Sequence, residues 1–188
     1  MGRWQPDALG RLQQAALELY GERGFEPTAV ADIAERAGLT ERTFFRYFAD
    51  KREVLFSGGE ALIEVFVKNV AAAPDSRAPL DVVGEALQAA GGFFAGRIHQ
   101  SRARQAVIDA NPSLQERELS KLATLGAAVA EALRARGVDD PAAVLAAEAG
   151  ITVFKVSFDR WVNGPDDQEF SDVVRTTMED FKAVARGS

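Results

Sequence analysis

The sequence contains no cysteine and a single histidine, His99, among its 188 residues. Without cysteine there is no disulfide, no thiolate metal site and no cysteine nucleophile. A zinc site needs several histidines or thiolates, and a Ser-His-Asp triad would depend on His99 alone. A di-iron Glu-x-x-His pair fails because Gly96 stands three residues before His99, and the motifs Gly-x-x-x-x-Gly-Lys and Gly-x-Ser-x-Gly are missing. We therefore expect no enzymatic activity, no bound metal and no cofactor.

Long apolar runs are missing as well. No stretch approaches the roughly 20 apolar residues that span a bilayer, and residues 1–10 lack the apolar segment of a secretory signal. The chain has 22 Lys and Arg residues against 28 Asp and Glu residues, a net charge of −6. This charge disfavours nucleic acid bound over the whole surface, but it allows a local basic surface. The sequence predicts a cytoplasmic protein with no membrane partner.

Apolar residues recur every three to four positions along almost the whole chain, which is the period of helices with one buried face. The pattern predicts an all-α protein of about nine helices. Between capping, glycine and proline signals their expected ranges are 7–23, 28–37, 40–48, 51–70, 80–99, 101–110, 113–137, 140–163 and 169–185. Residues 73–79 read as a linker with two prolines. We expect two domains, residues 1–56 and residues 57–188.

Residues 28–48 contain two short helical segments separated by a three-residue turn around Gly38. This pattern is typical of a helix-turn-helix, in which the first helix braces the second and the second enters the DNA major groove. Thr28 and Thr40 are expected to cap the two helices, and phosphate contact is a further role for both. Helical geometry predicts an inner, bracing face of Ile33, Leu39, Phe44 and Phe48. It predicts an outer face of Arg42, Thr43, Arg46 and Tyr47.

The charge distribution supports the same outer face. Residues 36–52 hold five cationic and two acidic side chains, a local excess of +3 in a chain whose net charge is −6. Arg42 and Arg46 can form bidentate hydrogen bonds to guanine or bind phosphate. The alternative interpretation is that they belong to a solvated helix face. Lys51 is expected in the first turn of the next helix, where the helix N-terminus also attracts phosphate.

The chain resembles the N-terminal domain of TetR-type transcriptional regulators over residues 8–56. The resemblance is carried by Phe25, Thr28, Val30, Ile33-Ala34, Ala37-Gly38-Leu39, Thr43-Phe44, Tyr47-Phe48 and Lys51. It implies a three-helix DNA-binding head and a body of about six helices that binds a ligand and dimerises. By position, Glu41 and Arg42 would face the groove, whereas Thr43, Tyr47 and Lys51 would hold phosphates. Ala29 and Phe45 depart from the family pattern, which often has hydroxyl side chains at both positions.

Residues beyond the linker carry weaker signals. A ligand site in the body is predicted from aromatic residues near Gly91-Gly92 and on the penultimate helix, together with nearby arginines. The predicted ligand-binding residues are Phe93, Phe94, Arg97, Arg102, Phe154, Phe158 and Trp161. The alternative for the aromatic residues is ordinary core packing, and the alternative for the arginines is a solvated charged face. The body also resembles, loosely, the subgroup that senses acyl-CoA-like or other lipophilic molecules, through residues 117–122 and 159–161.

Together these observations predict a cytoplasmic, ligand-responsive regulator, with residues 41–47 as recognition helix. We expect a homodimer through the last two helices, since two recognition helices must be about one DNA turn, 34 to 36 Å, apart or a multiple of it. The expected action is repression, released from a palindromic operator by a small lipophilic or acyl-type effector. The alternative is a helical adaptor or interaction protein that retains the head without binding DNA.

Overall fold

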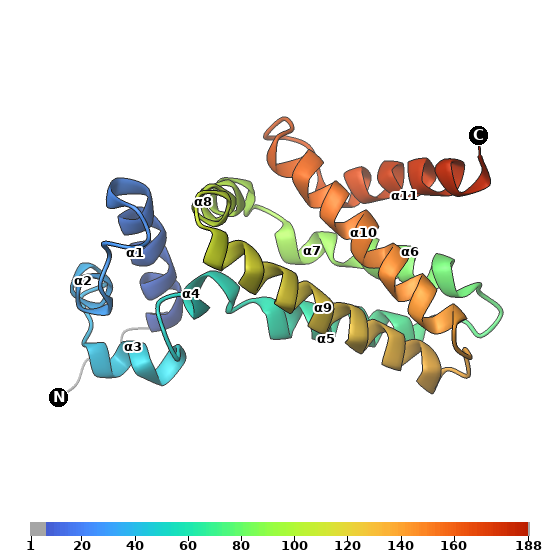
Figure 1. Cartoon of the computed structure of the whole chain (residues 1–188), viewed down its shortest axis with the longest axis horizontal. Helices are drawn as coiled ribbons and strands as arrows, with labels where there is room; N and C mark the ends of the chain where they lie inside the picture. Colours follow the sequence, from blue (N-terminus) through green and yellow to red (C-terminus); the bar gives the residue numbers. More distant parts are fainter. Residues whose placement is uncertain (1–6, 188) are drawn as a thin grey trace. The chain divides into compact units, whose positions relative to one another are not determined.

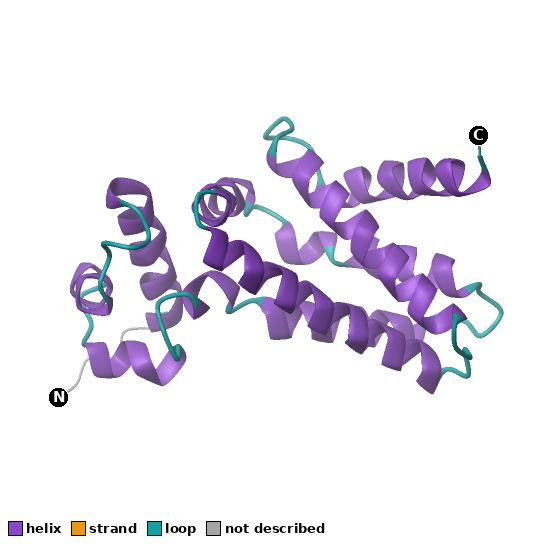
Figure 2. Cartoon of the chain, viewed as in Figure 1, coloured by secondary structure: helices purple, strands orange, loops and turns teal. Residues whose placement is uncertain are grey.

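The computed structural model describes residues 7–187, which form helices and connecting loops without any strand (Figure 2). In chain order the helices are α1 (Ala8–Arg23), α2 (Val30–Arg36), α3 (Glu41–Tyr47), α4 (Glu53–Phe56), α5 (Gly59–Ala72), α6 (Pro79–Ala89), α7 (Gly91–Phe94), α8 (Ile98–Asp109), α9 (Pro112–Ala135), α10 (Ala142–Val162) and α11 (Phe170–Arg186) (Figure 1). Two of them, α4 and α7, are single turns of four residues. The nine longer helices of the described range confirm the predicted all-α fold.

Two predicted helices, over residues 51–70 and 80–99, are interrupted. Within residues 80–99, α6 ends at Ala89, α7 is a separate turn, and α8 begins at Ile98. Within residues 51–70, the interruption lies between α4 and α5. The structure ends α4 at Phe56 and begins α5 at Gly59, and between them the hydroxyl of Ser57 donates to the carbonyl oxygen of Val54 at 3.2 Å. Two adjacent glycines, Gly58 and Gly59, explain the interruption, because each costs about 1 kcal/mol relative to alanine inside a helix.

The chain divides into two compact units. The first, the head unit, contains the described residues up to Gly58 together with His99–Glu118, and the second, the body unit, contains Gly59–Ile98 and the described residues from Leu119 onward. The division after Gly58 lies two residues from the expected boundary, but residues 99–118 belong to the first unit and not to the C-terminal domain as the sequence predicts. Arg104 accounts for part of this difference, since its guanidinium donates to the carbonyl oxygen of Leu55 at 2.7 Å.

The head unit has its own apolar core. The inner face of α1, including Leu12 and Leu19, packs with Ile33 of α2 and Phe44 of α3, and these four side chains are almost completely buried. Gly24 ends α1 with a φ of +89°, a left-handed conformation that favours glycine, and its N–H donates to the carbonyl oxygen of Tyr20 at 3.0 Å. The predicted end of the first helix is therefore confirmed.

The body unit is built around α6, α10 and α11, which pack against one another, while α5 packs on α6. Gly150 of α10 lies where a Cβ atom would overlap the Val83 side chain of α6, so the glycine permits the close approach of these helices. None of the helices within residues 7–187 combines the length and the apolarity that a membrane-spanning segment requires.

Candidate functional site

The turn between α2 and α3 is tight and closed by backbone hydrogen bonds. The N–H of Gly38 donates to the carbonyl oxygen of Glu35 at 2.9 Å, and the N–H of Leu39 donates to that of Ala34 at 2.8 Å. Gly38 has a φ of +63°, which a residue with a side chain rarely adopts. Thr40 then caps α3, because its hydroxyl oxygen accepts from the N–H of Thr43 at 3.2 Å. The predicted cap at Thr40 is confirmed.

The inner face of α3 is firmly packed. The side chain of Phe44 is 0% exposed, and its ring centre lies 5.2 Å from that of the buried Phe48. Ile33 is also fully buried, and Leu39 packs against the same cluster. The predicted bracing face is confirmed, and because it is buried the opposite side of the seven-residue helix faces solvent.

That outer face carries Glu41, Arg42, Arg46 and Tyr47, all of them exposed. The guanidinium of Arg46 donates to the hydroxyl of Tyr47 at 3.0 Å and lies 4.8 Å from its ring centre. The hydroxyl of the half-buried Thr43 lies 3.0 Å from that of Thr40. The structure thus brings five of the predicted DNA-contact residues, together with the Thr40 cap, onto one helix. What they contact remains a prediction.

Thr28 does not hold the predicted cap position of α2. It is 1% exposed, and its hydroxyl donates to the carbonyl oxygen of Gly24 at 2.8 Å. The cap position of α2 is held by Ala29, whose N–H donates to the carboxylate of Asp32 at 2.9 Å. With its only hydroxyl proton donated inward, Thr28 closes the connection between α1 and α2 and has no exposed donor for a phosphate.

Lys51 does not lie in the first turn of the next helix as expected, because α4 begins at Glu53. Its ammonium group donates to three carbonyl oxygens, those of Phe25 at 2.9 Å, Glu26 at 2.9 Å and Thr28 at 3.1 Å. It also lies 4.5 Å from the centre of the Phe25 ring. An ammonium group has three N–H donors, and all three are occupied. In this structure Lys51 therefore clamps the connection between α1 and α2.

Two other cations of residues 36–52 are paired with carboxylates. Arg36 of α2 donates two hydrogen bonds of 2.8 Å to Glu22, and this interaction lowers the pKa of the Glu22 carboxyl group. Arg52 donates to Asp50 at 2.7 Å, and this hydrogen bond lowers the pKa of the Asp50 carboxyl group. The local excess of +3 therefore overstates the positive charge that faces outward.

Phe45 stands where the family pattern often has a hydroxyl side chain, and in the structure its ring is exposed. The side chain is 54% exposed on α3, between Arg42 and Arg46 in sequence. Its ring meets that of Phe44 edge to face with centres 5.5 Å apart, which holds an apolar group beside the charged ones. The sequence signal that could have indicated this exposed ring is a large apolar side chain among the polar residues of the outer face.

In the body unit, most of the predicted ligand residues belong to one aromatic cluster. The ring of Phe94 lies 6.1 Å from that of Phe154, 5.6 Å from that of Phe158 and 5.6 Å from that of Trp161. Phe93 contacts Phe94 edge to face at 5.1 Å, and the Arg97 guanidinium lies 4.9 Å from the centre of the Phe93 ring. Arg102 lies in the segment that belongs to the head unit, not in the body unit.

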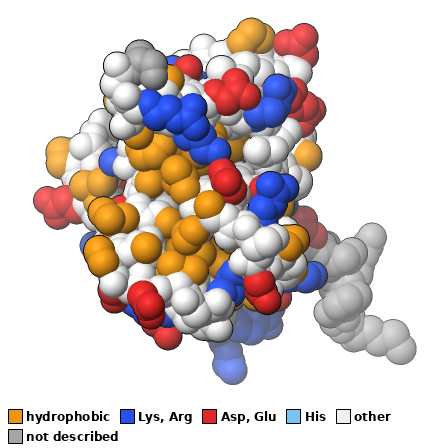
Figure 3. Space-filling view, turned by 90° about the vertical axis from the view of Figure 1, so that its right-hand side faces the viewer, with side chains coloured by type: hydrophobic (Ala, Val, Ile, Leu, Met, Phe, Trp, Pro, Cys, Tyr) orange, Lys and Arg blue, Asp and Glu red, His pale blue; other side chains and the backbone are white. Residues whose placement is uncertain are grey.

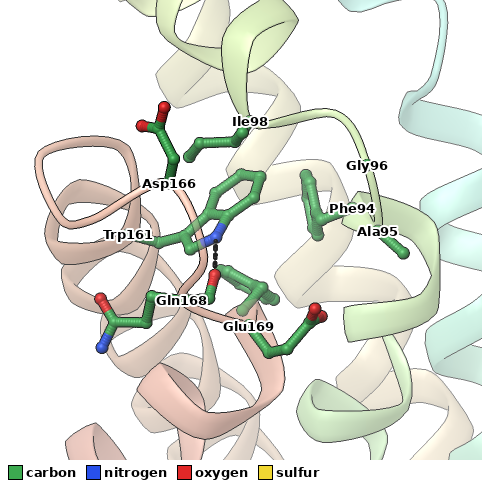
Figure 4. A pocket seen from close by; sticks show the side chains of 9 residues that line it. Phe94, Ala95, Gly96, Ile98, Trp161, Asp166, Gln168 and Glu169 are labelled. Carbon is green, nitrogen blue, oxygen red and sulfur yellow. Dashed lines mark hydrogen bonds between the residues drawn. The ribbon is translucent and has the colours of Figure 1, made fainter.

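A cavity of about 160 Å³ lies beside the aromatic cluster (Figure 4). Only Phe94 and Trp161 of the seven predicted ligand residues line it. The sequence analysis missed the rest of the wall, which includes Ile98, Asp166, Gln168, Glu169 and Phe170. The indole N–H of Trp161 donates to the carbonyl oxygen of Gln168 at 2.9 Å, which ties the α10–α11 connection to the wall.

Two family models match the chain. The model described as bacterial regulatory proteins, tetR family, matches residues 12–57, which include α2, the turn and α3. The model described as MftR C-terminal domain matches residues 77–186, more than half of the chain.

Two curated relatives are named as transcriptional regulators. The HTH-type transcriptional regulator TcmR of Streptomyces glaucescens is 31% identical over 138 residues, which cover 69% of this chain and 60% of TcmR. MftR of Mycobacterium tuberculosis, described as a mycofactocin biosynthesis transcriptional regulator, is 34% identical over 119 residues, which cover 61% of this chain and 58% of MftR. The chain thus spans about three fifths of the length of these relatives.

Solved structures share the fold at lower identity. The transcriptional regulator FadR from Bacillus subtilis, crystallised in complex with stearoyl-CoA, matches with a TM-score of 0.60 and 17% identity. The match covers 92% of this chain and 96% of the FadR chain. At this identity the likeness concerns the fold alone.

Proposed function

The chain belongs to the TetR family of bacterial regulatory proteins, and from this premise we propose that it is a ligand-responsive transcriptional repressor. In a cytoplasmic homodimer, α3 of each protomer enters the major groove of a palindromic operator. A small lipophilic or acyl-type effector binds the body unit and lowers the affinity for the operator. The protein itself catalyses no reaction.

The outward face of α3 carries this proposal. Because Phe44 is completely buried beneath it, the helix is presented with a fixed orientation, and Arg42 and Tyr47 are exposed on the other side. An α-helix of this kind fits the major groove, which is about 12 Å wide. The arginines supply hydrogen-bond donors for guanine edges and phosphates, and the hydroxyls of Tyr47 and Thr43 supply further phosphate contacts.

The ion pairs set the expected strength of the electrostatic contribution. Arg36 and Arg52 are paired with carboxylates and the donors of Lys51 are occupied by carbonyls, so Arg42 and Arg46 are the cations of residues 36–52 whose charge remains for DNA. A dimer then brings four such cations, and at about −0.9 per neutralised phosphate the logarithm of affinity should change with the logarithm of salt with a slope of about −3.6. Between 50 and 200 mM salt this corresponds to a loss of affinity of roughly a hundredfold.

Phe45 supplies a different kind of contact. Its exposed ring lies on the same short helix as the arginines, and apolar side chains in the major groove contact the 5-methyl group of thymine. In the proposed complex Phe45 therefore contacts a thymine base. This base contact takes the place of the phosphate contact that a hydroxyl side chain would make at this position.

Dimerisation through α10 and α11 is supported by apolar side chains that the single chain leaves exposed. Leu145 is 65% exposed and Val184 is 78% exposed, and Val144 and Val156 are exposed as well. Figure 3 shows that apolar side chains gather on one face, bordered by charged residues. Burying such a face against a second copy is favourable at about 25 cal/mol per Å² of apolar area. The resulting two-fold pair would hold two copies of α3 at a fixed separation.

Effector release is proposed as a shift between two body conformations, of which the effector prefers the one with the wrong separation of the heads. The FadR structure with stearoyl-CoA supports an acyl-type effector, and the aromatic cluster around Phe94 supports a lipophilic one. A cavity of about 160 Å³ is smaller than the usual 300 to 1,000 Å³ of ligand sites, so a long acyl chain requires the cluster to open.

The decisive experiment selects bound fragments of the source genome and measures binding of the selected duplex by fluorescence anisotropy at several salt concentrations. Arg42→Ala and Tyr47→Ala should each weaken binding about fivefold or more, since a good base or phosphate contact contributes about 1 to 3 kcal/mol. Arg36→Ala is the matched control, because its guanidinium is already held by Glu22. Retained affinity in both α3 variants would refute the assigned face, and the absence of any salt-dependent duplex binding would favour the adaptor.

The contact of Phe45 has a test of its own in the selected operator. Replacing one thymine by uracil removes only the 5-methyl group, so a uracil scan should find a position in each half-site that weakens binding of the wild type. Phe45→Ala should weaken binding to the thymine duplex and abolish the difference between thymine and uracil there. A uracil effect that persists unchanged in Phe45→Ala would assign the methyl contact to another residue.

A further inference from the structure

Arg46 and Tyr47 lie in the last turn of α3 and contact each other on its exposed face. The guanidinium of Arg46 donates to the Tyr47 hydroxyl at 3.0 Å, and its central carbon lies 4.8 Å from the centre of the Tyr47 ring. A hydrogen bond and a cation–π contact therefore join the same two side chains. An arginine that is held at two points has fewer side-chain conformations than one that extends freely into solvent.

The ring of Tyr47 is supported in turn from inside the head unit. Its centre lies 6.4 Å from that of Phe48, which is 3% exposed, and the Phe48 ring packs 5.2 Å from that of the fully buried Phe44. A tyrosine side chain has few rotatable bonds, so a ring that rests on a buried neighbour is a stiff support. The exposed guanidinium of Arg46 is thus connected through Tyr47 to the apolar core beneath α3.

Arg42, the other outward arginine of α3, has no such support. Its guanidinium is exposed and makes no hydrogen bond, ion pair or ring contact within residues 7–187. Arg46 has no carboxylate partner in the same range, so no acidic group neutralises its charge. The two arginines are therefore equal in charge and exposure but differ in how firmly they are held, which indicates different roles in binding.

The donors that remain on Arg46 and Tyr47 suit one phosphate group. A guanidinium has five N–H donors, one of which binds Tyr47, and the Tyr47 hydroxyl accepts that bond while it keeps its own proton to donate. A charged donor group and a neutral donor therefore lie next to each other on the exposed face of α3. A DNA phosphate accepts hydrogen bonds from arginine and from tyrosine side chains, and its negative charge strengthens the bond from arginine.

We propose that Arg46 and Tyr47 form one phosphate clamp, in which Tyr47 positions Arg46 and both side chains donate to the same DNA phosphate. The clamp is part of the DNA contact of α3 and therefore rests on the proposed function. Arg42, the arginine without support, is left to reach the base edges. Because the two residues of the clamp contact each other and share one partner, their contributions to binding are not additive.

A double-mutant cycle on the selected operator duplex measures this coupling by fluorescence anisotropy. Tyr47→Phe keeps the ring and removes only the hydroxyl. It should weaken binding about fivefold when Arg46 is present, but less than about twofold in the Arg46→Ala background. The matched control pairs Tyr47→Phe with Arg42→Ala, which removes an equal charge from the same helix. In that cycle the loss caused by Tyr47→Phe should be the same with and without Arg42.

A methylphosphonate scan of the operator, which replaces one charged phosphate at a time by a neutral group, locates the contact. At one position in each half-site the replacement should weaken binding of the wild type, and at that same position both Arg46→Ala and Tyr47→Phe should lose their effect. Different positions for the two variants, or additive losses in the first cycle, would overturn the clamp while operator binding itself stands. A wild type without salt-dependent duplex binding would instead refute the proposed function, and the clamp with it.

Discussion

Replacing Lys51 by methionine tests whether this residue serves the fold or the DNA. Methionine keeps most of the length and apolar volume of the lysine stem but removes the ammonium group. The change deletes three hydrogen bonds, to the carbonyl oxygens of Phe25, Glu26 and Thr28, and the contact with the Phe25 ring. If Lys51 clamps the connection between α1 and α2, the loss appears in the stability of the protein.

The expected magnitude follows from these contacts. A hydrogen bond to a charged group contributes about 1.5 to 3 kcal/mol when it is buried. Lys51 is half-buried, water can reach the freed carbonyls, and three bonds from one ammonium group are not additive, so the sum is far smaller than three full contributions. We expect a loss of about 2 to 3 kcal/mol, which for a chain of this size lowers Tm by about 4 to 12 °C.

The assay combines thermal unfolding of the full chain with operator binding as a function of salt. A clamp predicts a lower Tm and an unchanged salt slope at temperatures where the variant is folded. A phosphate contact predicts the reverse, an unchanged Tm and a slope that is shallower by about 0.9 for each protomer. Lys68→Met, at an exposed lysine of α5, is the control and should change stability by less than about 0.5 kcal/mol. An unchanged Tm in Lys51→Met would refute the clamp.

Two glycines of the body unit should respond to alanine with opposite signs. At Gly150 the new Cβ atom would overlap Val83, which should cost about 1 to 3 kcal/mol. At Gly92 the new Cβ atom would have no packing neighbour from outside its own helix within 4 Å, and the less flexible unfolded chain should give a gain of about 0.4 to 1 kcal/mol. Urea unfolding measures both, and a common sign would contradict the packing described. A pH effect is expected from Tyr20, because burial, with a smaller effect of the Asp50 charge, raises the pKa of its hydroxyl. Above about pH 10 the unfolded chain loses this proton and the folded chain keeps it, so stability should fall as pH rises. Urea titrations between pH 9 and 11 should show a shallower fall in Tyr20→Phe, and equal slopes would exclude this group as the cause.

The helices and the exposed face of α3 could be predicted because their signals are local. Gly24 ends α1 through a bond to Tyr20, four residues earlier, and Thr40 caps α3 through Thr43, three residues later. The buried face of α3 follows from the spacing of Phe44 and Phe48 in the same way. These three signals each join residues that lie within a few positions of one another, so the sequence alone contains them.

Contacts across long sequence distances explain what could not be predicted. Residues 99–118 join the head unit through Arg104, which binds the carbonyl of Leu55 49 residues earlier, and through Arg117, which binds Glu53 64 residues earlier. An arginine on an exposed helix carries no local sign of such a partner. The cavity has the same character, since its two sides come from connections more than 60 residues apart that the sequence marks only as the ends of helices.

Thr28 and Lys51 show a second reason, because their partners are backbone carbonyls rather than side chains. Residues 24–28 connect two helices, so their carbonyl oxygens lie outside the helical hydrogen-bond ladders and need other donors. The hydroxyl of Thr28 and the ammonium group of Lys51 supply these donors inside the head unit. A sequence motif contains such residues but does not distinguish the ones that stabilise the fold from the ones that are exposed on the surface. Within the motif, the polar atoms that face inward hold α3 in place, and in the proposed function the exposed side chains of α3 contact the DNA.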